Sequence, residues 1–177
     1  MTVEDRSDVN KILRVLEELS STAVRIGILS SAGGEILMIA NVNEYGCDIP
    51  VTDKMRGYFR GVFGINIRKD TTKIRIPERS FIRSSYDENK GKFRTYDDYL
   101  GAVLDMKISV QDFYQIVGSA CVNTIKEYIK RGNFEPDSSL TLEQKKPKTK
   151  PLIDTGRLIN SIDYEVIRIW ACLILKA

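Results

Sequence analysis

Residues 109–132 read SVQDFYQIVGSACVNTIKEYIKRG, and this stretch predicts the clearest helix of the chain. Ser109 can cap its N-terminus, with Asp112 in the position where a capping box usually has Glu or Gln. Gly132 stands where a helix C-cap is expected. Apolar or small side chains recur at helical spacing along one face, at Phe113, Ile116, Val117, Ala120, Cys121, Thr124, Ile125 and Tyr128. We therefore expect a long amphipathic helix from Val110 to Arg131, with this face in the core.

β-branched runs before and after this helix predict the sheet that packs against it. Residues 23–29 alternate like a strand, and residues 162–175 are rich in the side chains that favour terminal strand structure. Residues 65–68 and 72–76 predict a hairpin that extends this sheet, and Pro77 ends its second run.

Three further segments predict shorter helices. Ser7 can cap the first, which leaves its charged positions to solvent and has an apolar face made of Val9, Ile12, Leu13, Leu16 and Leu19. The second is a short, largely buried helix over 35–44, which a glycine ends, and the third spans Asp53 to Phe63. Asp154 or Thr155 can also cap one helical turn that runs through residue 161.

Length and composition favour one domain. The 177 residues are 42% hydrophobic, which suffices for one sizeable core and is short for two. Residues 133–151 contain three of the five prolines and no apolar period, so they predict a flexible arm. We expect a single α+β domain over 1–177, in which a small mixed or antiparallel sheet packs against the long helix.

The composition excludes many kinds of chemistry. The chain has no histidine, which removes Ser-His and Cys-His nucleophiles, histidine metal sites and the commonest general base. Cys47, Cys121 and Cys172 form no CxxC pair, so we expect reduced, mostly buried thiols. No apolar run reaches the roughly 20 residues that span a bilayer, and the N-terminus lacks a signal-peptide pattern. We expect a protein that stays in the cytoplasm where it is made and has no membrane partner.

Charge is distributed unevenly along the chain. The net charge of +3 combines −5 over residues 1–53 with +8 over 54–94, −1 over 95–132 and +1 over 133–177. An acidic start beside a basic middle suits either contact with nucleic acid or head-to-tail docking of identical subunits. Residues 68–94 also interleave basic with aromatic side chains, as surfaces that bind phosphates or stack on bases do.

Sequence motifs for catalysis are short. Asp154-Thr155-Gly156 matches the local signature of aspartic proteases, in which two carboxylates share a proton. About 20 residues follow this tripeptide, which is too few for a flap and a second glycine segment, and a helix cap is the simpler interpretation. The glycines match no phosphate-binding loop, and the scattered acidic residues Glu35, Glu44, Glu78 and Asp87 have no DxD or ExxE spacing that would bring two of them to one helical face. We expect no cofactor and no metal ion.

Three segments, in order along the chain, are similar to segments of one group of proteins. Residues 40–46, ANVNEYG, match an Ala-x-Val-x-Glu-aromatic-Gly pattern, and residues 76–83, IPERSFIR, match Ile-Pro-x-Arg-x-Phe-Leu-Arg. The third is 147–158, PKTKPLIDTGRL, followed by Ser161-Ile162. Together they resemble minor structural proteins of tailed phages and prophages, namely the virion-morphogenesis, tail-completion and neck (head-tail joining) families.

The resemblance implies a small α+β protein with no catalytic residue. Proteins of these families form a ring, expected to be a hexamer, that caps the tail tube and joins the tail to the head connector. The implied partners are other copies of the chain, the tail tube protein and connector proteins, with passing contact with genome DNA. The implied location is the neck of the virion, assembled in the bacterial cytoplasm. Tail terminator and head-side neck protein both remain open, and the alternatives are a DNA-binding phage accessory protein and an aspartic-type protease.

Two sets of residues follow from these considerations. Those expected to contact partners are Arg68, Lys69, Lys73, Arg75, Arg79, Arg83, Lys145, Lys146, Lys148 and Lys150. Those expected to have structural roles are Glu44, Gly46, Pro77, Phe81, Leu152, Ile153, Asp154, Thr155, Gly156 and Leu158.

Overall fold

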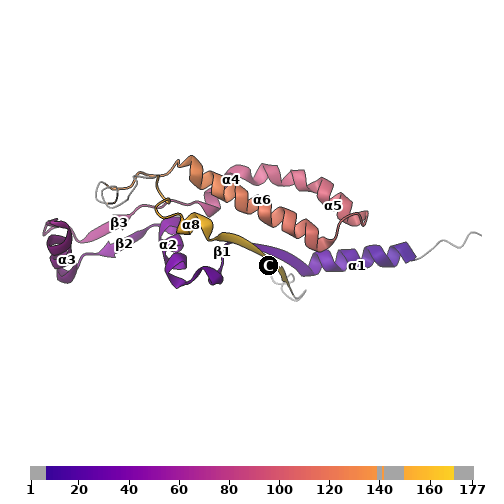
Figure 1. Cartoon of the computed structure of the whole chain (residues 1–177), viewed down its shortest axis with the longest axis horizontal. Coiled ribbons are helices and arrows are strands. Elements are labelled where there is room, and N and C mark those ends of the chain that lie inside the picture. Colours follow the sequence, from indigo (N-terminus) through magenta and orange to yellow (C-terminus); the bar gives the residue numbers. More distant parts are fainter. Residues whose placement is uncertain (1–6, 139–140, 142–149, 170–177) are drawn as a thin grey trace, which may run out of the picture.

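The computed structural model describes residues 7–138, 141 and 150–169, and α6 (Val110–Arg131) is the long helix of its body (Figure 1). The Ser109 hydroxyl accepts a hydrogen bond from the Asp112 backbone N–H at 3.0 Å, and the Asp112 carboxylate accepts the Ser109 N–H at 3.4 Å. Gly132 ends the helix in the left-handed conformation, at φ +73°. The predicted helix is confirmed, with aspartate completing the capping box.

One pair of antiparallel strands covers α6. β1 (Thr22–Ile28) pairs with β4 (Ile162–Arg168) along their whole length, with Thr22 opposite Arg168. Both strands contact α6. The predicted strands at these positions and the α+β class are therefore confirmed.

The hydrophobic core lies where α2 (Gly34–Tyr45), α6 and β4 meet. The approach of β4 to α6 is so close that a Cβ on Gly118 would lie 2.3 Å from Cδ2 of the Tyr164 ring. The buried members of the core are Ile36, Ala40, Phe81, Val122, Ile125, Tyr128, Ile129, Leu158, Ile159 and Ile162.

Short helices complete the body, and two elements project from it. The short helices are η1 (Ser30–Ala32), α4 (Ile82–Asn89), η2 (Lys90–Tyr96), α5 (Asp97–Leu104) and α8 (Arg157–Asn160). α1 (Ser7–Ser21) projects at one end of the elongated molecule (Figure 1). At the other end, strands β2 (Cys47–Pro50) and β3 (Lys73–Ile76) carry α3 (Asp53–Phe63) at their tip. We call residues 47–76 the hairpin extension.

The pairing of β2 with β3 corrects the predicted hairpin. Residues 65–68 form no strand, and β3 pairs antiparallel with β2, apart from the β1–β4 sheet and not as an extension of it. The Arg56 guanidinium on α3 gives the physical reason, because it donates hydrogen bonds of 2.6–3.4 Å to four backbone carbonyls within 67–71. These carbonyls are held against α3 and do not join a strand ladder.

Smaller predictions also change. Gly156, at φ +78°, occupies the cap position of α8, so neither Asp154 nor Thr155 caps the helix; the Thr155 hydroxyl accepts only a long 3.5 Å hydrogen bond from the Arg157 N–H. Cys47 is exposed, against expectation, while Cys121 is buried. Cys172, residues 170–175 of the predicted terminal strand and most of the predicted arm at 133–151 lie outside the described residues.

Candidate functional site

The first two segments of the resemblance meet at the buried carboxylate of Glu44. This residue lies in the last turn of α2 and is only 5% exposed. Its Oε2 accepts hydrogen bonds from the backbone N–H groups of Phe81 and Ile82 at 2.8 and 3.0 Å. Its Oε1 accepts the Arg83 N–H at 3.0 Å and the Ser80 hydroxyl at 2.9 Å. The carboxylate therefore satisfies the unpaired donors at the N-terminus of α4, where negative charge is favoured. We call Glu44 with residues 78–83 the Glu44 junction.

Arg83 completes the Glu44 junction. Its Nε donates to Oε1 of Glu44 at 3.1 Å, and its Nη2 donates to the Glu44 backbone carbonyl at 2.7 Å and to the Glu78 carboxylate at 2.8 Å. The guanidinium also lies over the Tyr45 ring, 4.5 Å from its centroid. Burial acts to raise the pKa of Glu44, but hydrogen bonds from residues 80–83 outweigh it, so this pKa lies below its ordinary value. Glu44 is therefore ionised at neutral pH.

Gly46 and Asn43 bring the same two segments into backbone contact. Gly46 adopts φ +71°, and a Cβ there would lie 3.0 Å from the Glu78 nitrogen and 3.1 Å from the Ile76 carbonyl oxygen. The Asn43 carbonyl accepts the Arg79 N–H at 2.7 Å. Since Gly46 precedes β2 and Ile76 ends β3, these contacts lie at the base of the hairpin extension.

Arg79 was predicted to contact partners, but its side chain is buried within the chain. Its side chain is 7% exposed, and its guanidinium donates to the carbonyls of Glu135 and Pro136 at 2.8 and 3.1 Å. Its Nη2 also lies 3.2 Å from the buried carboxylate of Asp137. A buried charge requires such partners, so Arg79 ties the chain after α6 to the Glu44 junction.

The third segment of the resemblance packs on the core beside α2. Three of its apolar side chains contribute to the core: Leu152, Ile153 and Leu158. Arg157 makes a two-pronged ion pair with Glu35 of α2, at 3.0 and 3.3 Å. Asp154 and Thr155 are exposed in the turn before α8. All three segments therefore contribute to the same region of the molecule.

The other basic residues predicted to contact partners fall into three groups. Four are exposed on the hairpin extension: Arg68, Lys69, Lys73 and Arg75. The Lys150 Nζ instead donates to the carbonyls of Lys130 and Arg131, at 2.8 and 3.4 Å, and so caps the C-terminus of α6. Lys145, Lys146 and Lys148 lie outside the described residues. The hairpin extension as a whole contains seven Lys or Arg against three Asp or Glu, a net charge of +4.

The tip of the hairpin extension has an exposed surface that the sequence did not single out. On α3, Tyr58 and Val62 are more than half exposed, whereas Phe59 and Phe63 are partly buried against each other, with ring centroids 5.5 Å apart. Gly57 and Gly61 lie one helical turn apart beside them, and among the described residues no atom outside the neighbouring helix backbone would come within 4 Å of a Cβ on either. Glycine in a helix interior costs about 1 kcal/mol relative to alanine, and no described contact of the chain requires it here.

α1 also exposes much of its apolar face. The helix is confirmed, and its C-terminal part contacts β1, α5 and α6. Its apolar side chains are nevertheless exposed at Val9, Ile12, Leu13 and Leu16. Clustered exposed apolar side chains of this kind mark interaction surfaces.

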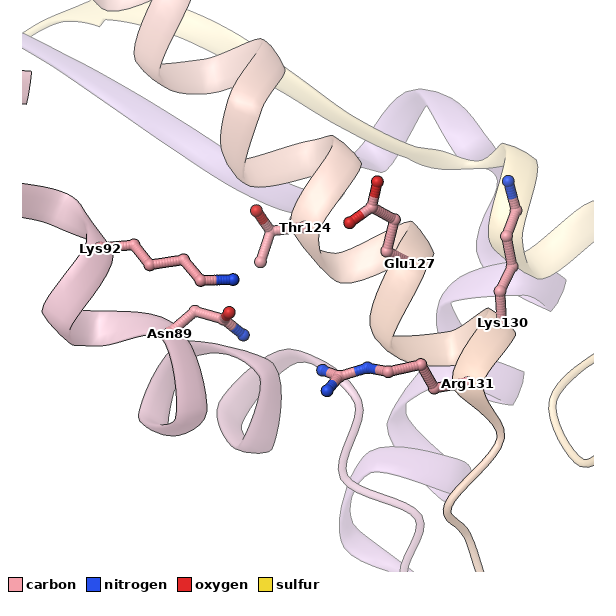
Figure 2. A pocket seen from close by; sticks show the side chains of 6 residues that line it. All are labelled: Asn89, Lys92, Thr124, Glu127, Lys130 and Arg131. Atoms are coloured by element: carbon pink, nitrogen blue, oxygen red, sulfur yellow. The ribbon is translucent and has the colours of Figure 1, made fainter. Parts of the chain in front are cut away.

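A pocket of about 480 Å³ lies between α4, η2 and the C-terminal half of α6. Figure 2 shows Lys92 and Asn89 extending in the same direction into the pocket, with Arg131 of α6 extending toward them from the other side. The Thr124 hydroxyl donates to the Ala120 carbonyl at 2.9 Å, so it is not paired with a base. The pocket has more positive than negative groups and, among its described lining residues, no activated nucleophile.

The described part of the chain contains no cluster of three or more His, Cys, Asp or Glu that could hold a metal ion. None of its described helices is long and apolar enough to span a bilayer.

Comparison of the chain with models of protein families, with curated proteins and with solved structures finds no match.

Proposed function

We propose that this chain is a non-enzymatic structural protein of the neck of a tailed phage or prophage particle. In this proposal it forms a ring, expected to be a hexamer, that caps the tail tube and joins the tail to the head connector. Both positions, tail terminator and head-side neck protein, are included, because both would require the same kind of ring.

One observation carries the proposal: the residues on which the resemblance rests have specific contacts with one another. Glu44 and Gly46 of the first segment bind residues 76–83 of the second, and the third segment packs on the helix that bears Glu44. The third segment also packs Leu152, Ile153 and Leu158 in the core cluster that holds Ala40 of the first segment and Phe81 of the second. This convergence supports reading the three matches together.

The distribution of surface features also supports a binding role. A ring built from one kind of subunit by heterologous contacts needs two different, complementary surfaces on each subunit. This molecule exposes apolar side chains at both ends, and one of these ends, the hairpin extension, has a net charge of +4. The basic hairpin extension suits contact with an acidic surface of the tail tube, the connector or passing genome DNA.

The proposal is tested by measuring the mass of the purified chain by light scattering after size exclusion, over a range of concentrations. Negative-stain imaging should follow, with tail tubes assembled from the tube protein of the same phage or prophage, and tubes alone as the control. Closed rings or capped tube ends are expected. A monomer that ignores tubes but binds duplex DNA, with affinity falling steeply as salt rises, would overturn the proposal in favour of a DNA-binding accessory protein.

The protease alternative has its own control. Asp154 is exposed and lies outside the Glu44 junction, so Asp154→Asn should leave ring formation unchanged. Hydrolysis of an unfolded protein substrate by the wild-type chain that Asp154→Asn abolishes would support the protease alternative instead.

A further inference from the structure

Two exposed helical faces lie at opposite ends of the molecule (Figure 1). We define the α1 face as Val9, Ile12, Leu13 and Leu16, and the α3 face as Gly57, Tyr58, Gly61 and Val62. The body formed by α6 and the β1–β4 sheet separates them, so they cannot meet within one copy. Covering either face would remove apolar surface from water, which favours association.

The two faces have complementary shapes. The α1 face is a row of branched side chains, whereas Gly57 and Gly61 leave the backbone of the α3 face open beside Tyr58 and Val62. Helices pack by placing the side-chain ridge of one into the groove of another, and glycine allows the closest approach. Apart from the neighbouring backbone of α3 itself, no described atom of the same copy lies within 4 Å of a Cβ built on Gly57 or Gly61. The missing side chains therefore leave room for a group from outside the copy.

Charge favours a contact between the α1 face of one copy and the α3 face of another over a contact between two α1 faces or two α3 faces. Residues 1–21 contain five Asp or Glu and three Lys or Arg, a net charge of −2, while the hairpin extension has +4. Glu17 borders the α1 face one turn after Leu13, and Lys54 borders the α3 face one turn before Tyr58. Two copies of the same face would bring like net charges together, which opposes pairing.

We infer that the α1 face of one copy docks on the α3 face of a second copy, so that subunits join head to tail. This inference rests on the proposed function and adds the surfaces that build the ring. Such a contact is heterologous, and its repetition closes into a ring when the rotation between neighbours allows closure.

Two single substitutions remove one face each. Leu13→Glu places a charge in the α1 face, and Val62→Glu places one in the α3 face. Both side chains are more than half exposed in a single copy, so the fold should be kept, which circular dichroism and thermal melting will check. Met38→Glu is the matched control, because Met38 is equally exposed on α2, away from both faces. Each face variant should need about tenfold or more protein to assemble, and the control should behave like the wild type.

Mixing the two face variants gives the decisive measurement. The Val62→Glu chain keeps an intact α1 face, and the Leu13→Glu chain keeps an intact α3 face. A one-to-one mixture should therefore form pairs and stop there, whereas each variant alone stays monomeric. If copies instead pair through two α1 faces, Val62→Glu alone will form dimers, and adding Leu13→Glu will produce no further pairs. That result would overturn the inference.

The outcomes separate this inference from the proposed function. If both face variants still form wild-type rings that cap tail tubes, the inferred interface is wrong and the proposed function stands. If the mixture forms pairs but the wild type caps no tube, the interface stands and the proposed function is wrong.

Discussion

Glu44→Gln tests how strongly the Glu44 junction stabilises the fold. The amide keeps one acceptor oxygen and puts an NH₂ donor where the other carboxylate oxygen was. If the remaining oxygen stays with Ser80 and Arg83, the backbone N–H groups of Phe81 and Ile82 lose their acceptor. Each unsatisfied buried donor costs about 1–3 kcal/mol, and loss of the charge at the helix N-terminus costs up to about 1 kcal/mol more. The free energy of unfolding should therefore fall by about 2–7 kcal/mol, and Tm by about 2–4 °C for each kcal/mol lost.

Urea denaturation followed by circular dichroism, together with thermal melting, measures this loss. Glu78→Gln is the matched control: it removes the other carboxylate that binds Arg83, at an exposed position, and should cost less than about 1 kcal/mol. A loss below about 1 kcal/mol for Glu44→Gln, or equal losses for the two variants, would refute the account of the junction given above.

Three further predictions concern pH and glycine. Burial acts to raise the pKa of Glu44, but its hydrogen bonds lower this pKa overall. The ionised carboxylate therefore stabilises the fold at neutral pH, and this stabilisation is lost as pH falls below about 4.5. Urea titrations between about pH 6 and pH 3 should show the free energy of unfolding of the wild type approaching that of Glu44→Gln. Gly118→Ala should lower the free energy of unfolding by about 1–3 kcal/mol in the same assay, and by much less in a Tyr164→Ala background, because the new Cβ would strike that ring. Gly61→Ala should raise Tm by about 2–4 °C in melts of dilute protein, yet weaken assembly measured by light scattering.

The helices were predictable from the sequence because their signals are local. α3 runs from Asp53 to Phe63 as predicted, with Gly64 after it in the left-handed conformation. α6 shows its predicted capping box and C-terminal glycine. Side-chain period and capping residues lie within a few positions of the ends that they define, so one sequence is enough to read them.

The contacts that set the tertiary structure were not predictable in this way. Arg56 binds carbonyls 11 to 15 residues away and so prevents the predicted hairpin, and Glu44 caps a helix 37 residues later in the chain. One signal for Glu44 was present, since an acidic residue in the last turn of a helix opposes the helix dipole. It indicates that the carboxylate has another partner but does not identify it. Likewise the pattern of α1 predicted its apolar face but could not tell whether this face packs inside the molecule or against another copy.

The Glu44 junction matters for assembly because of where it lies. In the proposed ring each subunit must hold its α1 face and its α3 face at one fixed rotation, since heterologous contacts with variable angles give open chains. α1 continues directly into β1, which is paired with β4, so one face is fixed to the body. The α3 face is carried on the hairpin extension, whose base is fixed by Gly46 and the Glu44 junction. The segments that resemble phage neck proteins contain neither face. This agrees with the proposed ring, because residues that fix the angle of a contact between subunits need not take part in that contact.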